Sequence, residues 1–160
     1  MFRIGMGQDS HRFSSDQSRK LVLAGVTVED EAGLECNSDG DAILHALCNA
    51  LEQAIGGDSF SVYADPMCQQ EITDSREYLK VALAHIEEKN FEIENVGISI
   101  EAKRPKILPL GQQLRQNLSQ LLQLEKSRIG INATSGEGLT AFGRGEGIQV
   151  WATVLLRQKT

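Results

Sequence analysis

The sequence predicts an α+β fold in one domain over residues 1–160, with a mixed β-sheet and helices on one of its faces. A chain of 160 residues is long enough for one hydrophobic core and too short for two ordinary domains. Segments of strand-like alternation and of helical apolar spacing follow one another along the chain, without an internal repeat or a linker. The last apolar segment is hydrophobic on both sides, as a strand inside a covered sheet should be.

Segments that alternate or are mostly apolar predict β-strands over residues 3–8, 21–28, 96–102, 129–133 and 148–156. Apolar residues at helical spacing predict helices that begin after Ser38, at Asp74 and after the turn at 105–109. Ser38 is the expected N-cap of the first helix, with Asp41 at the capping-box position. Residues 58–73 show neither pattern and are predicted to form a loop.

The strand over residues 148–156 has no polar side. Val150 and Val154 point one way, and Trp151 and Leu155 point the other way. Helices on one face of the sheet leave the second side uncovered in so short a chain. We therefore expect another subunit to cover that side.

The composition excludes several classes of protein. With 41% hydrophobic and 24% charged residues, the chain is that of a globular protein, and no apolar run approaches the ~20 residues of a membrane span. A net charge of −6 argues against nucleic acid as a partner. The start of the chain is strand-like and shows no targeting segment, and the three cysteines lack metal-ribbon spacing, so we expect reduced thiols and a cytoplasmic location.

Asp9 and His11 are the first candidate metal ligands. Residues two apart in a strand point to the same side, so this carboxylate and this imidazole converge, although the pair alone is more typical of a solvated strand end. His45 lies one helical turn after Asp41 and alone is more typical of a structural histidine. Together, Asp9, His11 and His45 offer three ligands and an open fourth position, as in catalytic zinc sites. His85 has no such acidic neighbour and is expected to be structural.

Two further regions have features of anion-binding loops. Residues 133–138 and 143–147 are rich in glycine and hydroxyl residues, whose amides and hydroxyls suit phosphate oxygens. Glu137 is placed to hold a divalent cation and Arg144 to meet a second anion, but a turn between strands explains these segments equally well. Residues 103–109 contain two prolines and two lysines and predict a rigid loop whose backbone groups can read a base edge.

These segments together resemble the 2-C-methyl-D-erythritol 2,4-cyclodiphosphate synthase family of the non-mevalonate isoprenoid pathway. The likeness covers the whole chain through four ordered motifs: R-I-G-M-G-Q-D-S-H-R-F, S-D-G-D-A-I-L-H-A-L, R-P-K-I-L-P, and A-T-S-G-E-G-L followed by G-R-G-E-G-I. The resemblance implies a lyase that cyclises 4-diphosphocytidyl-2-C-methyl-D-erythritol 2-phosphate to 2-C-methyl-D-erythritol 2,4-cyclodiphosphate with release of CMP. It also implies a homotrimer, with its sheets packed around the trimer axis and its active sites between neighbouring subunits.

The resemblance also implies roles for single residues. Asp9, His11 and His45 would bind zinc, and Glu137 would bind magnesium or manganese. Asp41 is placed to support these ligands from a second layer, although a capping role alone is an equal alternative. The resemblance thus implies two metal ions, one bound by residues from the first third of the chain and one bound by a residue near its end.

The implied catalytic residues are Asn37, which stands where the family usually has histidine, and Ser135. The resemblance implies that Arg144 and Glu146 line a central cavity of the trimer, where an isoprenoid diphosphate is expected. The residues implied to contact the cytidine diphosphate substrate are Ser10, Ser38, Asp58, Ser59, Phe60, Tyr63, Ala64, Asp65, Pro66, Met67, Ala102, Lys103, Arg104, Pro105, Lys106, Ile107, Leu108, Ala133, Thr134, Gly136, Phe142 and Arg144.

Two other functions fit the same residues. A generic metal-dependent phosphohydrolase could use the Asp/His/His site, but it would release phosphate and need no base pocket. A non-catalytic trimeric protein that binds nucleotides or isoprenoid diphosphates could keep the pocket loop and the cavity. The presence of all three candidate ligands together with Glu137 favours an enzyme over the binding protein.

Overall fold

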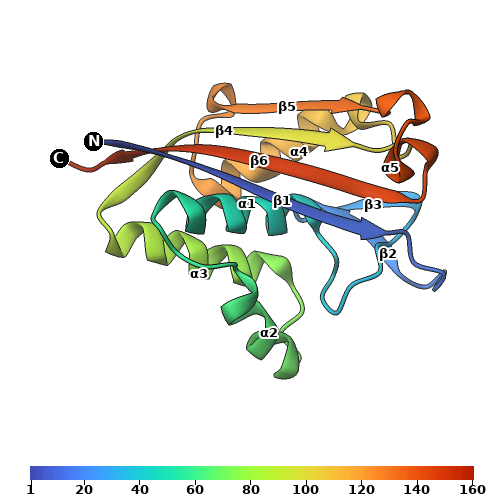
Figure 1. Cartoon of the computed structure of the whole chain (residues 1–160), viewed down its shortest axis with the longest axis horizontal. Helices are drawn as coiled ribbons and strands as arrows, with labels where there is room; N and C mark the ends of the chain where they lie inside the picture. The colour runs from blue at the N-terminus through green and yellow to red at the C-terminus, as the bar shows by residue number, and fades with distance from the viewer.

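A four-stranded sheet with the strand order β1–β6–β4–β5 forms the centre of the computed structural model, which describes residues 1–160 (Figure 1). Its strands are β1 Phe2–Arg12, β4 Phe91–Glu101, β5 Ile129–Thr134 and β6 Gly147–Gln158. β6 pairs antiparallel with β1 and β4, whereas β4 and β5 are parallel. β1, β4 and β5 therefore run in the same direction and end at the same edge of a mixed sheet, which confirms the predicted class.

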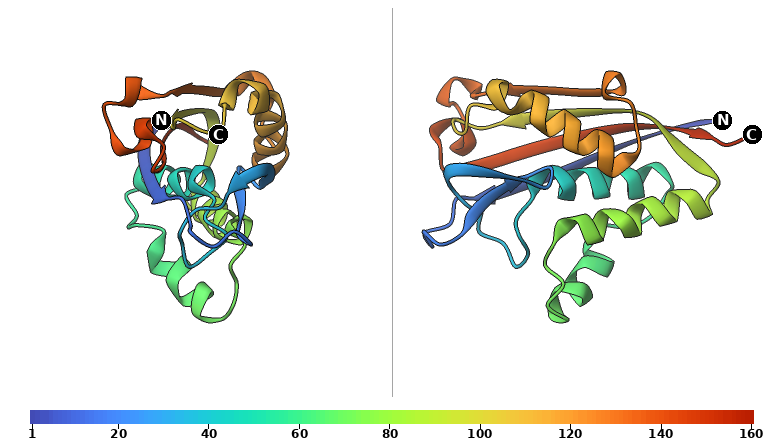
Figure 2. Two further views of the ribbon diagram at one scale, coloured as in Figure 1. Left: turned by 90° about the vertical axis from the view of Figure 1, so that its right-hand side faces the viewer. Right: turned by 180° about the vertical axis from the view of Figure 1, so that it is seen from behind.

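Helices cover one face of this sheet, as predicted (Figure 2). α1 (Ala42–Ala54) packs against β1 and β6, and α4 (Ile107–Leu122) packs against β5. α3 (Ser75–Glu88) lies against α1 as an outer layer. The remaining helical segments are short: α2 Ser61–Gln69, η1 Lys126–Arg128, η2 Gly136–Gly138 and α5 Ala141–Arg144.

Two glycines of β1 bring α1 unusually close to the sheet. A Cβ atom at Gly5 or Gly7 would lie 1.9 or 2.0 Å from a backbone carbonyl oxygen of α1, so no other residue fits there. The odd-numbered residues of β1 therefore face α1, since side chains alternate along a strand. Asp9 and His11 continue the same row, which directs both side chains toward the start of α1.

The single strand predicted over residues 21–28 was wrong. The structure has a hairpin of β2 (Lys20–Leu23) and β3 (Val26–Ala32), which forms a separate two-stranded sheet. Its turn is made by Ala24 and Gly25, both with left-handed backbone angles (φ 52° and 71°). Alanine rarely adopts this conformation, so the turn interrupts an apolar run that reads as one continuous strand.

The loop predicted over residues 58–73 was also wrong, because α2 occupies its centre. Ala64 is the one buried residue of α2, so the helix has no apolar stripe that could reveal it. Pro66 stands inside the helix at an exposed position, which further masks the helix in the sequence.

The first helix begins at Asp41 rather than at Ser38. The Asp41 carboxylate accepts hydrogen bonds from the amides of Leu44 at 3.0 Å, Ala24 at 2.9 Å and Gly25 at 2.5 Å. Asp41 is thus the N-cap of α1 and also ties the helix to the β2–β3 turn. Both carboxylate oxygens accept hydrogen bonds from backbone amides, which is the capping role that the sequence offered as one of two alternatives for Asp41.

The other helix starts agree better with the sequence. Asp74 is the N-cap of α3 as predicted, and its carboxylate accepts from the amide of Arg76. α4 starts at Ile107, inside the turn predicted at 105–109. Pro109 lies in the first turn of α4, where a missing N–H leaves no hydrogen bond unmade.

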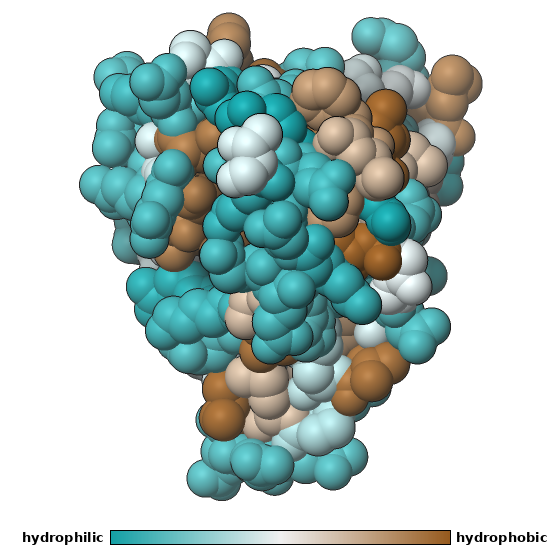
Figure 3. Space-filling view, turned by 90° about the vertical axis from the view of Figure 1, so that its left-hand side faces the viewer, coloured by the Kyte–Doolittle hydropathy of each residue, from teal (hydrophilic) through white to brown (hydrophobic).

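The other face of the sheet has no helix over it and is apolar along β1. Phe2, Ile4 and Met6 are 61, 71 and 56% exposed, and Trp151 and Leu155 of β6 are half-buried on the same face. Figure 3 views the end of the molecule that carries both termini and shows hydrophobic side chains reaching the surface among polar ones. None of the helices is both long and apolar enough to cross a membrane.

Candidate functional site

The three predicted metal ligands meet at the edge where β1 ends. Oδ2 of Asp9 lies 2.9 Å from Nε2 of His11 and 3.1 Å from Nδ1 of His45. Asp9 and His11 come from the last residues of β1, and His45 comes from the first turn of α1. The structure therefore brings together a carboxylate and two imidazoles from two rigid elements.

The second nitrogen of each imidazole is held by the surrounding structure. His11 Nδ1 donates to the carbonyl oxygen of Glu35 at 3.0 Å. Ser75 Oγ donates to Asp39 at 2.5 Å and lies 2.8 Å from Nε2 of His45, so it accepts the Nε2 proton of that ring. Nε2 of His11 and Nδ1 of His45 are thereby left facing Asp9, which is how histidines are oriented to bind a metal once these two nitrogens have lost their protons.

The charges of the cluster also fit a divalent metal. Nε2 of His11 is buried without a well-aligned hydrogen-bond partner, although it lies beside the Asp9 carboxylate. This carboxylate, and after it the Cys36 thiol, raises the pKa of His11 to about 10. Burial opposes ionisation of Asp9, but its contacts with His11 and His45 outweigh burial and lower its pKa. A cation bound by Asp9, His11 and His45 would replace protons that the imidazoles hold in its absence.

Cys36 is a member of this cluster that the sequence did not reveal. Its Sγ and one ring nitrogen each of His11 and His45 lie within 4.8 Å of one another. Burial alone would raise the pKa of the Cys36 thiol, but hydrogen bonds with His11 and then Ser38 lower it to about 6. Cys36 stands in the loop before α1, where no spacing rule connects it to the histidines.

A second part of the candidate site is a pocket where β4 and β5 end. It joins two segments that were predicted to bind a nucleotide. The pocket has a volume of about 490 Å³. Its walls include Gly111, Arg115 and Asn132, which sequence reasoning missed because helix α4 and strand β5 had no pattern of ligand residues. The predicted residues that line it are Ala102, Pro105, Lys106, Ile107, Leu108, Ala133, Thr134 and Ser135.

Lys103 and Arg104 lie outside this pocket. The Arg104 guanidinium pairs with Glu31 at 2.8 Å and lies 3.9 Å from the centre of the Phe13 ring. The Lys103 amide donates to the carbonyl oxygen of Phe142. The loop thus presents Lys106, but not Arg104, to the pocket.

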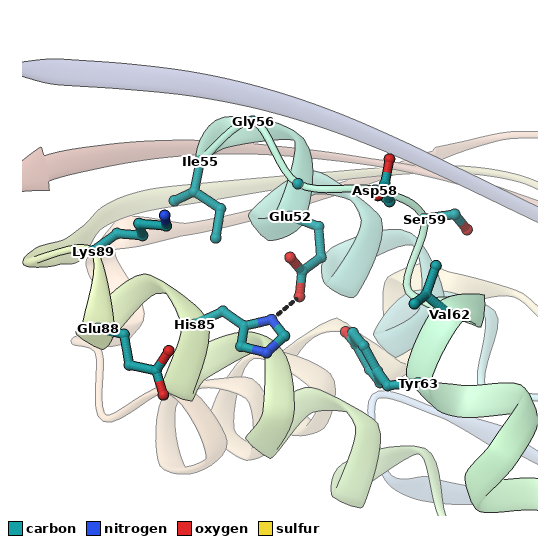
Figure 4. A pocket seen from close by; sticks show the side chains of 11 residues that line it. Glu52, Ile55, Gly56, Asp58, Ser59, Val62, Tyr63, His85, Glu88 and Lys89 are labelled. Carbon is teal, nitrogen blue, oxygen red and sulfur yellow. Dashed lines mark hydrogen bonds and ion pairs between the residues drawn. The ribbon is translucent and has the colours of Figure 1, made fainter.

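A third pocket, of about 310 Å³, lies between the end of α1 and helices α2 and α3 (Figure 4). Asp58, Ser59 and Tyr63 line it, as does a buried carboxylate, Glu52, whose Oε1 lies 2.7 Å from Nδ1 of His85. His85 therefore has an acidic partner, and the prediction that it has none was wrong. The partner comes from α1, which the sequence pattern of α3 cannot indicate.

The other residues expected near α2 differ in exposure. The Phe60 ring packs on His45, with ring centres 4.9 Å apart, so it closes one side of the metal-ligand cluster. Ala64 is buried, Met67 is half-buried, and Asp65 and Pro66 are exposed.

The remaining predicted site residues lie around the end of β1 and the turn before β6. Ser10, Phe142 and Glu146 line a small pocket with His11. Arg144 Nε donates to Oε1 of Glu146 at 3.2 Å. The others are placed as follows: Asn37 and Glu137 are exposed, Gly136 is half-buried with a left-handed φ of 57°, and Ser38 is buried with its Oγ 3.2 Å from His45 Nε2.

The fold and the cluster define a class: an α+β protein with a carboxylate and imidazole donor group suited to a divalent metal. The particular family follows from comparison with known proteins. The model of the YgbB family matches residues 2–157, and the chain belongs to this family.

Relatives and solved structures agree with this assignment. The chain is 41% identical over 160 residues to 2-C-methyl-D-erythritol 2,4-cyclodiphosphate synthase from Chlamydia caviae, a match that covers 99% of this chain and 90% of the relative. The bifunctional IspDF from Campylobacter jejuni has a TM-score of 0.90 and 35% identity, and the match covers 99% of this chain and 42% of that longer chain. The CDP complex of IspF from Plasmodium falciparum has a TM-score of 0.86 and 28% identity, and the match covers 99% of this chain and 97% of that chain.

Proposed function

We propose that the protein is a 2-C-methyl-D-erythritol 2,4-cyclodiphosphate synthase. It would convert 4-diphosphocytidyl-2-C-methyl-D-erythritol 2-phosphate to the 2,4-cyclic diphosphate and CMP in non-mevalonate isoprenoid biosynthesis. The observation that carries the proposal is the meeting of Asp9, His11 and His45 at the sheet edge where residues 102, 105–108 and 133–135 also form one pocket. Membership of the YgbB family supports it.

The reaction does not require a strong general base from the protein. An oxygen of the 2-phosphate attacks the β-phosphorus of the diphosphate, and the bond to the CMP oxygen breaks. The nucleophile is already an anion, so the protein has to position it and offset charge. A divalent ion held by Asp9, His11 and His45, zinc by the choice of donors, would supply Lewis acidity to a phosphate oxygen.

The substrate carries about four negative charges, which this acidic chain would otherwise repel. Lys106 at the pocket wall, and Arg115 beside it, offset part of that charge. Glu137 is exposed and would hold a second ion, magnesium or manganese, which would supply positive charge for the departure of CMP. Ser135 and Asn37 would add a hydroxyl and a neutral amide as hydrogen-bond donors during the transfer.

The nucleoside end of the substrate is proposed to bind in the pocket between β4, β5 and α4. A pocket of about 490 Å³ is large enough for a nucleotide. Pro105 is buried there, so the loop backbone before α4 is rigid and suited to reading the edge of cytosine. The solved relative from Plasmodium falciparum is a CDP complex, which supports a cytidine diphosphate as the ligand.

We propose a homotrimer with the active site between subunits. The apolar face of β1 and β6 has no cover within the chain. The pocket lined by residues 102, 105–108 and 133–135 shares no lining residue with the Asp9, His11 and His45 cluster, so each would meet the other half from a neighbouring copy. Arg144 and Glu146 would then line a central cavity that accepts an isoprenoid diphosphate. Three free cysteines favour a reducing compartment, the cytoplasm.

The test is to incubate the purified protein with the cytidylyl substrate, with and without EDTA, and to follow products by phosphorus NMR. Cyclic diphosphate and CMP in equal amounts, with turnover lost in EDTA and restored by added metal, are the expected result. Release of inorganic phosphate instead would indicate a phosphohydrolase. Binding of substrate without any product would indicate a non-catalytic binding protein.

A further inference from the structure

Cys36 lies beside the candidate metal ligands and has no role in the reaction described above. Its thiol is free and half-buried, in the loop that joins β3 to α1. The Sγ atom and one nitrogen each of His11 and His45 lie within 4.8 Å of one another. The thiol also contacts Ser38 Oγ at 3.3 Å.

The backbone around Cys36 is anchored, so the position of the thiol is defined by the fold. Arg19 donates to the carbonyl oxygen of Cys36 at 2.6 Å. The preceding residue, Glu35, donates its amide to Arg12 at 2.8 Å and accepts from Nδ1 of His11 at 3.0 Å. The segment that carries the thiol is thus hydrogen-bonded to a metal ligand itself.

We infer that Cys36 is a fourth protein ligand of the metal centre, next to Asp9, His11 and His45. The inference rests on the metal centre of the proposed function and adds to it a ligand of different chemistry. Metal–ligand bonds of about 2.0–2.3 Å place tetrahedral donors about 3–4 Å apart. Cys36 Sγ and the two histidine nitrogens lie within 4.8 Å of one another, so the closure that Cys36 needs toward the imidazoles is on the order of 1 Å, which rotation of a cysteine side chain supplies.

A thiolate ligand changes which metal the site prefers. Thiolate and imidazole ligands suit zinc, whereas magnesium and manganese prefer oxygen ligands. Cys36 therefore favours zinc at this position and lowers the affinity for the oxygen-seeking ions. Loss of an orienting residue outside the ligand shell already weakens zinc binding about 10–100-fold, so loss of the thiolate should weaken it at least tenfold.

We expect substrate to displace Cys36 from the fourth coordination position of the metal. Four protein donors complete a tetrahedral shell, and catalytic zinc sites need an open or exchangeable position. Cys36 would hold that position while no substrate is bound and would give it up to a phosphate oxygen. The thiolate can do so by rotation of its short side chain, while the backbone of the loop stays in place.

Cobalt(II) loaded into the metal-free protein under anaerobic conditions reports on the ligands directly. Tetrahedral cobalt absorbs in the visible range, and a thiolate ligand adds a charge-transfer band in the near ultraviolet. We expect both features in the unaltered protein and in Cys68→Ser, a matched control whose half-buried thiol contacts the Tyr78 hydroxyl and is not part of the His11, Cys36 and His45 group. Cys36→Ala and Cys36→Ser should keep the visible absorption, lose the near-ultraviolet band and bind zinc at least about tenfold more weakly in chelator competition.

The outcomes separate this inference from the function on which it rests. Visible tetrahedral absorption without a near-ultraviolet band in the unaltered protein overturns the Cys36 ligand and leaves the three-ligand centre standing. A band that persists in Cys36→Ala also overturns it. If no cobalt binds with tetrahedral absorption, the inference fails together with the proposed metal centre.

Discussion

Asp9 Oδ2 lies 3.1 Å from Nδ1 of His45, although the two residues are 36 positions apart in the sequence. The contact exists because α1 lies directly on β1, and α1 can lie there because Gly5 and Gly7 carry no side chain. The metal-ligand cluster therefore depends on two glycines that touch none of its members.

Gly7→Ala should destabilise the protein and weaken zinc binding together. The new Cβ would lie 2.0 Å from a carbonyl oxygen of α1, so the helix has to shift, at about 3 kcal/mol of unfolding free energy. Gly111→Ala is the matched control, since its Cβ meets only the flexible Arg115 side chain at 3.5 Å and adds helix propensity worth up to about 1 kcal/mol. Urea unfolding at one fixed protein concentration measures the stability of both variants, and chelator competition measures their zinc affinity. Equal stability of the two variants would contradict the close-packing argument.

His45→Ala should lose turnover and most of its bound zinc while keeping its assembly. The substitution removes one metal ligand and leaves Asp9 and His11 in place on β1. His85→Ala is the control, because His85 also pairs with a carboxylate but lies in the pocket near α2.

Asn37→Ala, in contrast to His45→Ala, should lower the rate without releasing zinc. Zinc per chain, measured by mass spectrometry of the metal, decides: a full complement in His45→Ala would remove His45 from the ligand set.

The sequence predicted some side-chain contacts of the candidate sites and missed others. The difference is how far apart in the sequence the two partners of each contact lie. The convergence of Asp9 and His11 follows from strand alternation over two residues, and the structure has it. The pairing of Glu52 with His85 joins two helices 33 residues apart, and no local pattern carries that information. Cys36 joins the histidines through the path of a loop, which depends on tertiary contacts such as that with Arg19.

Elements with a buried side were predictable, and elements without one were not. The sheet strands and α1, α3 and α4 bury an apolar face, so their periodicity identifies them. α2 buries only Ala64 and has no periodicity to find. The β2–β3 hairpin was missed for a different reason, because its turn uses Ala24 with a φ of 52°. Turn prediction depends on residues that favour positive φ, and alanine is not among them.

CDP should bind more tightly than UDP if the backbone of residues 105–108 reads the base. Cytosine presents an exocyclic donor where uracil presents an acceptor, so the wrong base leaves a buried group unpaired at about 1–3 kcal/mol. Lys106→Ala should weaken both ligands by a similar factor, because it removes charge and leaves the backbone unchanged. Calorimetric titration of both nucleotides checks this. Equal affinity for CDP and UDP would refute the proposed base pocket.

Ile4→Glu should break the proposed trimer. Ile4 is 71% exposed on the uncovered sheet face, and a buried unpaired carboxylate there would oppose association. Val62→Glu is the matched control, because Val62 is 66% exposed but lies on α2, away from that face. Light scattering should give about three times the chain mass for the unaltered protein and the control, and one chain mass for Ile4→Glu. An unaltered protein that is monomeric and active would contradict the shared active site.

Asp41 should make the stability of the fold depend on pH. Its carboxyl group is fully buried, and this burial raises its pKa to about 6 despite the hydrogen bonds from three amides. An unfolded aspartate has a pKa of about 3.9, so the folded state binds the proton more tightly. The stabilisation from this proton is fully present below about pH 4 and is lost as pH rises through about 6, a change of about 3 kcal/mol.

Asp41→Asn removes this titration and keeps one oxygen that can accept from backbone amides. Groups shared by the two proteins cancel when the variant's unfolding free energy is subtracted from that of the unaltered protein. The difference should therefore be larger at about pH 4 than at about pH 8, by up to about 3 kcal/mol. Urea unfolding of both proteins at the two pH values and one protein concentration measures it. A difference that grows as pH rises would mean that the amide donors of Leu44, Ala24 and Gly25 stabilise the ionised carboxylate more than its burial opposes it.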